Sequence, residues 1–357
     1  MALNKGEWSE VYVFLKLLAD GKLYAADKDL NKIEKIYYPI LKILKEGTSG
    51  ELEFVRNSRI KVIDKSGNML IELTIEQFKE KSIELLSEIQ SSKKSAFEIP
   101  NILIFMHSIK ITNLKAKSKE KRDITLVVHD LFTGHNPTLG FSIKSRLGSA
   151  STLINASGST NFIYRLSIPL DNDIIQEINN IDTKSKIRDR IVKIRDRGSD
   201  LKYYGMENEK FEQNLMMIDS QFPVVVSEIL KLFYSGQGNT MSTLVEKLKA
   251  LNPCNFNLKN NHPYYEYKIK NFLTDSALGM TPNTVWTGHY DATGGYIIVK
   301  EDGNILCYHI YNRNEFQDYL YDNTKLETPS SKKHGFGKIY KDNGNQFFKL
   351  NLQVRFM

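Results

Sequence analysis

The sequence lacks the patterns that mark secreted, membrane-spanning and zinc-binding proteins. Its two cysteines, Cys254 and Cys307, lie far apart among 357 residues, so no disulfide framework is expected. No apolar run reaches the length needed to cross a bilayer, and the N-terminus shows no signal peptide. None of the seven histidines has a cysteine or glutamate at metal-ligand spacing, which disfavours a zinc site. These absences predict a protein of the reducing cytoplasm with no membrane partner.

A strong charge of one sign is also missing. The chain has 49 lysines and arginines against 42 aspartates and glutamates, a formal net charge of +7 with a pI near 9.0. This modest excess permits binding to nucleic acid without requiring it, because attraction to phosphates depends on where the cations cluster. A hydrophobic share of 41% is ample for a core. The length suggests about two domains, although a single elaborated α/β domain also fits.

One pair of predicted strands brings polar residues together. Asp123 opens the apolar run 124–128, a turn-rich loop follows at 133–137, and a second apolar run carries Ser142 and Lys144. Side chains alternate faces along a strand, so Ser142 and Lys144 share a face. If the loop returns the second strand beside the first, Asp123 approaches Lys144.

These residue types suit hydrolysis of a phosphodiester. Aspartate binds a hard cation such as Mg²⁺ through oxygen, and a lysine can steady a phosphate or orient an attacking water. The pattern resembles the Asp…(Asp/Glu)-x-Lys centre of the restriction-nuclease superfamily, except that Ser142 stands where a second carboxylate is usual. We expect Asp123 and the backbone carbonyl of Ile143 to hold the metal. Asp130 is the main rival for the metal aspartate; Asp123 is preferred because it begins the strand, nineteen positions before Ser142.

An early helix is predicted over residues 6–19, and it carries two acids. Apolar residues recur at helical spacing, at Trp8, Val11, Leu15 and Leu18. Glu7 and Glu10 fall near this apolar arc, where a carboxylate is costly unless a metal or a lysine compensates it. Related nucleases often supply a glutamate from such a helix, which Glu10 matches better, while Glu7 has the better inward angle. The alternative is that both are first-turn acids favoured by the helix dipole.

Longer segments resemble the HpaII-type restriction endonucleases along nearly the full chain. They are NKGEWSE at residues 4–10, GFSIKS at 140–145, TGHYDATGG at 287–295, YHIYNR at 308–313, NTKLE at 323–327 and KLNLQVRF at 349–356. The resemblance implies a type II enzyme that cuts double-stranded DNA at the palindrome CCGG with Mg²⁺. It also implies a cognate DNA methyltransferase that protects host DNA. A palindromic target favours a homodimer, although a monomer that cuts the strands in turn also fits.

The predicted fold is α/β (α+β), with a restriction-endonuclease-like central mixed sheet flanked by helices and a β-rich C-terminal part. The division expected is a nuclease core over 1–235, with the N-terminal helix and an inserted hairpin, and a β-rich DNA-recognition region over 236–357. A boundary is expected near Pro39, two short strands around a turn at 66–68, and a helix over 74–89. Residues 206–251 read as helical with a break at 236–239. Strands are expected at 296–299, 305–308 and 347–356.

Several basic or hydroxylic residues are candidates for contact with DNA. Arg146 follows the predicted catalytic strand, and the sequence Lys-Ile-Arg-Asp-Arg at 186–190 recurs at 193–197, which stacks Arg188 over Arg195 on a helix. Some CCGG-cutting families place an Arg-Asp-Arg element against guanines, but pairing of arginine with aspartate within the helix also explains the pattern. Arg313 is a further candidate. A polar loop expected at 324–341 is the leading site for base reading; its candidates are Lys325, Ser330, Ser331, Lys332, Lys333 and His334.

Two other classes of function compete with the nuclease. A noncatalytic DNA-binding or modification-sensing module of the same fold would explain Ser142, although such a module has little reason to keep both Asp123 and Lys144. An RNA-processing nuclease would present aromatic stacking platforms on a sheet. The many tyrosines permit this, but core and interface packing is their more frequent role.

Overall fold

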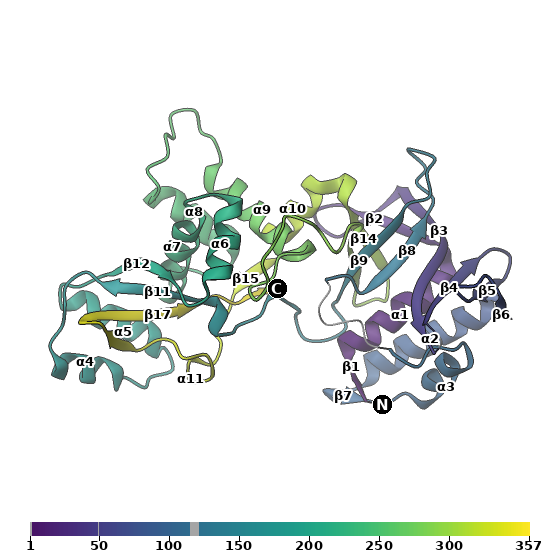
Figure 1. Cartoon of the computed structure of the whole chain (residues 1–357), viewed down its shortest axis with the longest axis horizontal. Coiled ribbons are helices and arrows are strands. Elements are labelled where there is room, and N and C mark those ends of the chain that lie inside the picture. Colours follow the sequence, from purple (N-terminus) through teal and green to yellow (C-terminus); the bar gives the residue numbers. More distant parts are fainter. Residues whose placement is uncertain (1, 49, 115–120) are drawn as a thin grey trace. The chain divides into compact units, whose positions relative to one another are not determined.

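The computed structural model describes residues 2–48, 50–114 and 121–357, which form two compact units (Figure 1). Unit 1 comprises residues 1–151 and 290–319, and unit 2 comprises 152–289 and 320–357. The boundary expected at 235/236 therefore lies inside unit 2. The reason is that the strands at 295–309 pair with strands from the first half of the chain. Local composition does not indicate that the chain comes back to the first unit in this way.

Unit 1 is built on a nine-stranded mixed sheet. Its order is β2-β14-β13-β9-β8-β3-β4-β5-β6, and an additional β2–β3 pairing closes the first six strands into a barrel-like sheet. The strands are β2 (Lys22–Ala26), β3 (Lys32–Gly47), β4 (Gly50–Arg56), β5 (Ile60–Ile63), β6 (Met69–Leu73), β8 (Ile124–Val128), β9 (Thr138–Ser145), β13 (Gly295–Val299) and β14 (Ile305–His309). The β9–β13 and β14–β2 pairs are parallel and the others antiparallel.

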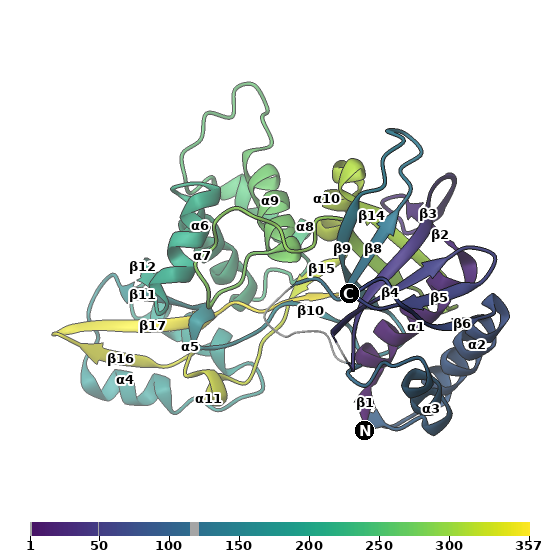
Figure 2. The ribbon, with the colours of Figure 1, turned by 45° about the vertical axis from the view of Figure 1, so that its right-hand side comes forward.

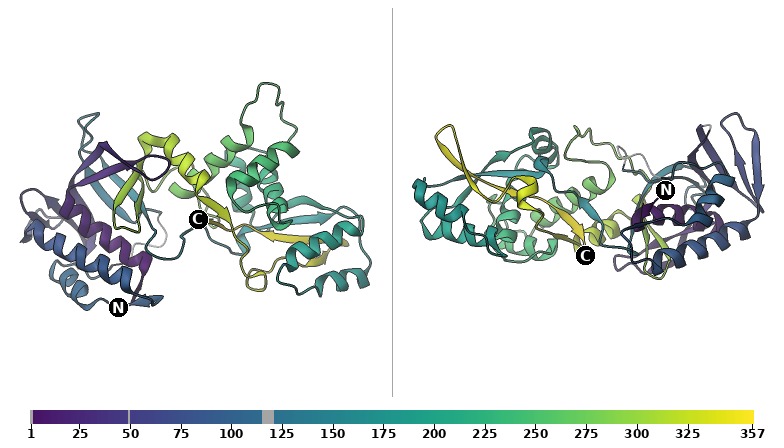
Figure 3. Two further views of the ribbon diagram at one scale, coloured as in Figure 1. Left: turned by 180° about the vertical axis from the view of Figure 1, so that it is seen from behind. Right: turned by 90° about the horizontal axis from the view of Figure 1, so that it is seen from below.

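Helix α1 (Lys5–Asp20) lies against this sheet and fixes the core of unit 1. It begins with a capping box between Asn4 and Glu7 and ends at Gly21, whose φ of 70° suits glycine. Trp8 and Phe14 are among its fully buried side chains. Figures 1 and 3 show α1 beside α2 (Ile75–Ser91) along one face of the sheet, with α3 (Pro100–Ser108) nearby. The helices predicted at 6–19 and 74–89 are thus confirmed.

Two predictions for unit 1 are wrong in detail. The boundary expected near Pro39 is instead the middle of the long strand β3, which pairs with β2 as far as Pro39 and with β8 from Ile40 onward. Pro39 has no N–H to donate, and it is tolerated where the strand changes partner next to a register shift. Residues 50–73 form three strands rather than two, with the expected turn between β5 and β6.

Unit 2 holds two smaller sheets and most of the helices. The sheets have the orders β12-β11-β17-β16 and β10-β18-β15. Their strands are β10 (Thr152–Ile154), β11 (Asn161–Leu166), β12 (Leu201–Met206), β15 (Thr324–Leu326), β16 (Ile339–Asp342), β17 (Asn345–Asn351) and β18 (Val354–Phe356). The helices are α4 (Asn172–Asn179), α5 (Lys186–Asp196), α6 (Glu209–Ile218), α7 (Phe222–Tyr234), α8 (Met241–Leu251), α9 (Tyr264–Leu278) and α11 (Ser331–His334). Helix α10 (Arg313–Asp322) crosses the boundary between the units.

The polar loop predicted at 324–341 is mostly ordered secondary structure. It contains β15, the single turn of α11 and the start of β16, because Thr324 and Ile339 are buried and their strands pair with β18 and β17. Residues 236–357 also include α8, α9 and α10, so the strands are only part of that region. The chain is a mixed α/β protein, as predicted at the level of class. In the part that the structure describes, none of the helices has the length and hydrophobicity to cross a bilayer.

Candidate active site

Asp123 stands immediately before β8 and beside the middle of β9. Figure 2 shows these two strands side by side. Its amide donates to the carbonyl of Phe141 at 2.8 Å. Its carboxylate Oδ2 accepts from the amide of Ile143 at 2.6 Å and from the hydroxyl of Ser142 at 3.1 Å. These bonds fix the direction of the carboxylate, while Oδ1 makes no hydrogen bond to the described residues.

Ser142 and Lys144 share one face of β9, as their spacing predicts. Phe141 and Ile143 point to the opposite face and pack in the core around α1. Ser142 is buried beside Tyr296, its partner on β13, and the Lys144 ammonium lies 5.6 Å from the centre of the Tyr296 ring. Ser142 therefore holds Asp123 in position, and Lys144 lies two residues further along the same face of the strand.

Glu10 reaches this strand end from α1. The hydroxyl of Ser9 bonds to that of Ser145 at 2.7 Å, which ties the helix to the end of β9. Burial, and then the charge of Asp123, raise the pKa of the Glu10 carboxyl to about 8, against the opposing effect of Lys45 and Lys144. Its Oε2 is buried and has no hydrogen-bond partner among the described residues. A buried carboxylate without a partner is stabilised when it takes up a proton or binds a cation.

Glu7 and Asp130, the rival candidates, are engaged in local structure. Glu7 Oε2 accepts from the Asn4 amide at 2.8 Å, which completes the cap of α1. Asp130 is buried after β8, where its carboxylate accepts from the Phe132 amide and the Thr133 hydroxyl, both at 2.8 Å. Asp130 therefore organises the β8–β9 loop, at the other end of the strand from Asp123.

Three charged residues that the sequence did not single out adjoin the cluster. Lys45 on β3 has its pKa lowered by burial, which Glu10 and Asp123 oppose. Burial, and then repulsion from Lys144, lower the pKa of Lys121 to about 8, and Asp291 opposes the shift. Asp291 accepts from the Lys121 amide at 3.3 Å. No local motif marks them: Lys45 lies in an ordinary alternating strand, and Asp291 is 168 positions beyond Asp123.

The donor set of this cluster fits a hard cation. Within the described ranges, no three His, Cys, Asp or Glu side chains converge as metal ligands. Two carboxylates are nevertheless enough for Mg²⁺, which keeps several waters and takes further ligands from a phosphate. Oε2 of Glu10 and Oδ1 of Asp123, which accept no hydrogen bond from the described residues, are oxygen ligands of the required kind.

The basic and hydroxylic candidates for DNA contact divide between the units. Arg146 and Arg313 are exposed in unit 1, and Arg146 lies 3.5 Å from the Tyr319 hydroxyl. Arg188 and Arg195 are exposed on α5 in unit 2, and they pair with Asp189 and Asp200. The others also belong to unit 2; they are Lys325 on β15, Ser330 as the N-cap of α11, and Ser331, Lys332, Lys333 and His334 in α11.

Two carboxylates beside a lysine at one strand end, without zinc ligands, are typical of a metal-dependent nuclease. The HpaII restriction endonuclease family matches residues 4–356 of the chain. The type II restriction enzyme HpaII of Haemophilus parainfluenzae is 48% identical over 356 residues, which cover 99% of this chain and 98% of that enzyme. No solved structure matches the chain.

The chain therefore belongs to the HpaII restriction endonuclease family. It is a type II restriction endonuclease, a site-specific deoxyribonuclease, and enzymes of this kind generally need a divalent metal ion. The resemblance seen in the sequence is confirmed, and the noncatalytic module and the RNA-processing nuclease are disfavoured.

Proposed function

We propose that this enzyme hydrolyses phosphodiesters of double-stranded DNA within the palindrome CCGG, with Mg²⁺ bound at Asp123 and Glu10. The single observation that carries the site assignment is the buried, unpartnered Oε2 of Glu10 beside Asp123 and near Lys144. CCGG rests on the resemblance to HpaII, and 48% identity over nearly the whole length of both chains supports it.

The side chains of the cluster would divide the work of hydrolysis. Asp123 and Glu10, with the Ile143 carbonyl, would hold Mg²⁺, which when bound polarises the scissile phosphate and stabilises the charge that develops on it. Lys144 would orient the attacking water on the same face. Ser142 takes the usual place of a second carboxylate and holds Asp123 in position through its 3.1 Å hydrogen bond. Glu10 thus supplies the charge that Ser142 lacks.

The sheet of unit 1 would then be the restriction-endonuclease-like core, and unit 2 would bind and read DNA. The remaining assignments belong to the same proposal: contacts to DNA from Arg146, Arg188, Arg195, Arg313, Lys325 and the residues 330–334, and a homodimer on the palindrome. A cognate methyltransferase would protect host DNA in the cytoplasm. The exposed cations of both units support contact with phosphates.

The first test is cleavage of unmethylated plasmid DNA in Mg²⁺ and in EDTA, with the ends of the fragments sequenced. Lys144→Ala and Asp123→Ala are expected to abolish cleavage and to leave DNA binding detectable, because neither side chain is needed for the core. Lys65→Ala, which removes an exposed lysine of unit 1 from the turn after β5, is the matched control and should cleave normally.

Discrete fragments ending within CCGG, lost in both site variants, would support the chemistry and the target together. Fragments that end elsewhere would remove CCGG and keep the nuclease site. Full cleavage by Lys144→Ala, or loss of folding in both site variants, would overturn the site assignment.

A further inference from the structure

The segment 328–340, which we name the recognition segment, is held to the rest of unit 2 by polar side chains that form hydrogen bonds with its main chain. The Asn161 amide donates to the carbonyl of His334 at 2.8 Å, and the Arg190 guanidinium donates to that of Gly337. Asn179 binds Ile339 twice, accepting from its amide at 2.8 Å and donating to its carbonyl at 2.9 Å. These bonds hold the backbone of the segment at residues 334, 337 and 339.

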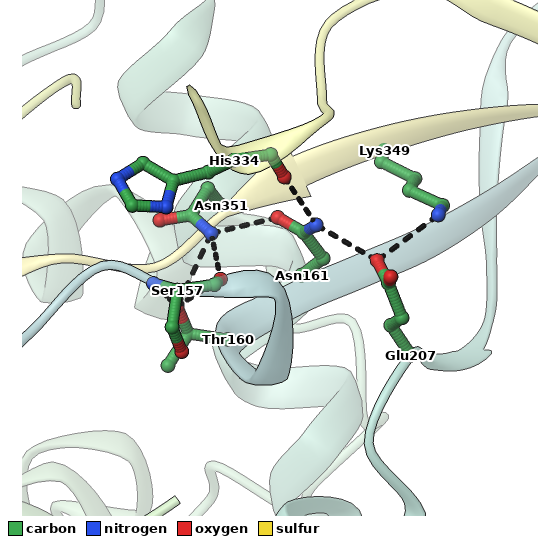
Figure 4. Close-up of polar contacts among 7 residues, drawn as sticks. All are labelled: Ser157, Thr160, Asn161, Glu207, His334, Lys349 and Asn351. Atoms are coloured by element: carbon green, nitrogen blue, oxygen red, sulfur yellow. Dashed lines mark hydrogen bonds and ion pairs between the residues drawn. The ribbon is translucent and has the colours of Figure 1, made fainter. Parts of the chain in front are cut away.

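The anchor at His334 is part of a wider buried network (Figure 4). Asn351 donates to Oδ1 of Asn161 at 2.7 Å, which sets the amide of Asn161 so that it donates to both His334 and Glu207. Glu207 in turn pairs with Lys349 at 3.0 Å. Asn161 and Asn351 are each only 1% exposed. These bonds favour the observed geometry of the two amides, because turning either side chain away would break several of them at once.

Residues of this segment line two cavities. One, of about 770 Å³, is lined by Asn179, Arg190, Lys332 and Lys338 among others. The second, of about 450 Å³, is lined by Arg188, Ser330 and Lys332 among others. Lys332 lines both cavities. Among the described residues, no carboxylate lies within ion-pair distance of Lys332 or Lys338, and both side chains are exposed.

We propose that the recognition segment reads base edges of the duplex, with Lys332 as a specificity-determining residue and Asn161 and Asn179 as positioning residues. The inference rests on the proposed function and names the part of unit 2 that selects the site. Lysine donates to guanine O6 and N7, the acceptors that a CCGG duplex presents on both strands of its major groove. A backbone fixed before binding loses little conformational freedom in the complex, so the lysines retain more of their contact energy as discrimination.

The chemistry of an ammonium group suits a phosphate as well as a guanine, and the two sources predict different results. A base contact discriminates between sequences, so its loss weakens cognate binding and spares binding to altered sites. A phosphate contact weakens binding to all sequences about equally and reduces the salt dependence. We commit to the base contact, because Lys332 lines two cavities and belongs to the helical turn whose last carbonyl, that of His334, is held by Asn161.

The test measures dissociation constants in EDTA for a short duplex containing CCGG and for duplexes with one substituted base pair. Lys332→Ala should reduce the ratio of cognate to substituted affinity by about 10-fold, as expected for one lost base contact. Asn179→Ala should reduce the same ratio, although Asn179 itself makes no contact with DNA in this proposal, because the segment loses one of its anchors. Lys259→Ala is the matched control; it removes one exposed lysine from the loop between α8 and α9, which Figure 1 shows on the other side of unit 2 from α11.

Each outcome decides between distinct ideas. If the wild-type protein does not prefer the CCGG duplex, the proposed function fails. If it does, and Lys332→Ala keeps the ratio or weakens all duplexes alike, the base-reading role of the segment is overturned. Asn179→Ala protein that remains folded by circular dichroism and keeps the full ratio would overturn the positioning role, because a purely structural residue changes stability and not selectivity.

Discussion

At the scale of single residues, the two glutamates of α1 have separate roles although they are one turn apart. Glu7 satisfies the free amide at the start of the helix, whereas Glu10 turns a buried carboxylate toward Asp123. The helical wheel placed both near the apolar arc and could not choose between them. The choice depends on the tie from Ser9 to Ser145, a contact between residues 136 positions apart.

Glu10→Gln and Glu7→Ala should therefore separate activity from stability. Glu10→Gln should lower the cleavage rate at least about 100-fold, since even outer-shell partners of metal ligands are worth about 10- to 100-fold. It should not lower the free energy of unfolding, because it removes a buried carboxylate that has no partner. Cleavage assays and urea unfolding of the same preparations measure both effects.

Glu7→Ala should show the reverse pattern. Loss of the capping box is expected to cost about 1 kcal/mol of stability and to leave the cleavage rate near that of the wild type. A large loss of activity in Glu7→Ala with normal cleavage by Glu10→Gln would exchange the two roles.

At the scale of elements, the sheet that carries the candidate site depends on a glycine where β13 begins. Gly295 has a φ of 106°, pairs with Phe141 and His309, and has no room for a Cβ, which would collide with the carbonyl of Tyr308. The close approach lets β13 lie between β9 and β14. Tyr296, the next residue, then meets Ser142 in register.

Gly295→Ala is accordingly expected to destabilise the protein by about 3 kcal/mol or more, from backbone strain together with the collision. Gly67→Ala is the control, because Gly67 has a similar φ of 82° in open space. That substitution should cost only the conformational term of about 1–2 kcal/mol. Equal losses in thermal or urea unfolding would show that the packing at Gly295 is unimportant.

The strands and helices of the site region were largely predictable, and their partners were not. The alternation of apolar and polar residues around Ser142 and the helical spacing of apolar residues from Trp8 onward are local patterns set by backbone geometry. The passage of β3 through Pro39 was missed, because a proline is acceptable there only when the strand changes partner at that point. That condition is a property of β2 and β8 rather than of residues 30–45.

At the scale of the whole molecule, unit 1 is complete only when residues 290–319 come back to it after the chain has passed through unit 2. His309 lies in this segment and is buried there. The ring is 3% exposed, stacks on Tyr38 with centroids 4.7 Å apart, and accepts at Nδ1 from the Tyr311 amide. Burial lowers the pKa of His309 to about 4, and the charge of Asp130 opposes this only in part. The folded protein therefore excludes the protonated ring.

The sign of the pH dependence follows from this shift. The folded pKa lies below the unfolded value of 6.5, so the contribution of His309 is complete above pH 6.5 and is lost as the pH falls toward 4. A shift of this size is worth about 3 kcal/mol. His309→Asn keeps an acceptor for the Tyr311 amide and removes the titration.

The free energy of unfolding should thus fall more steeply between pH 6.5 and 4 for the wild type than for His309→Asn. Carboxylates elsewhere titrate in both proteins, so the difference between the two curves is the quantity to measure. Parallel curves would contradict the burial of a neutral His309.

The sequence by itself determined the class of the protein, the strand pair that carries Asp123, Ser142 and Lys144, and the helix that carries Glu10, because these depend on local periodicity and on long family-like segments. Only the tertiary structure decided that Glu10 rather than Glu7 faces Asp123, that Lys45, Lys121 and Asp291 adjoin the cluster, and that residues 290–319 complete the first unit. Side chains separated by a hundred positions meet only when the strands are paired and the helix is packed. Contacts of that range leave no local pattern in the chain.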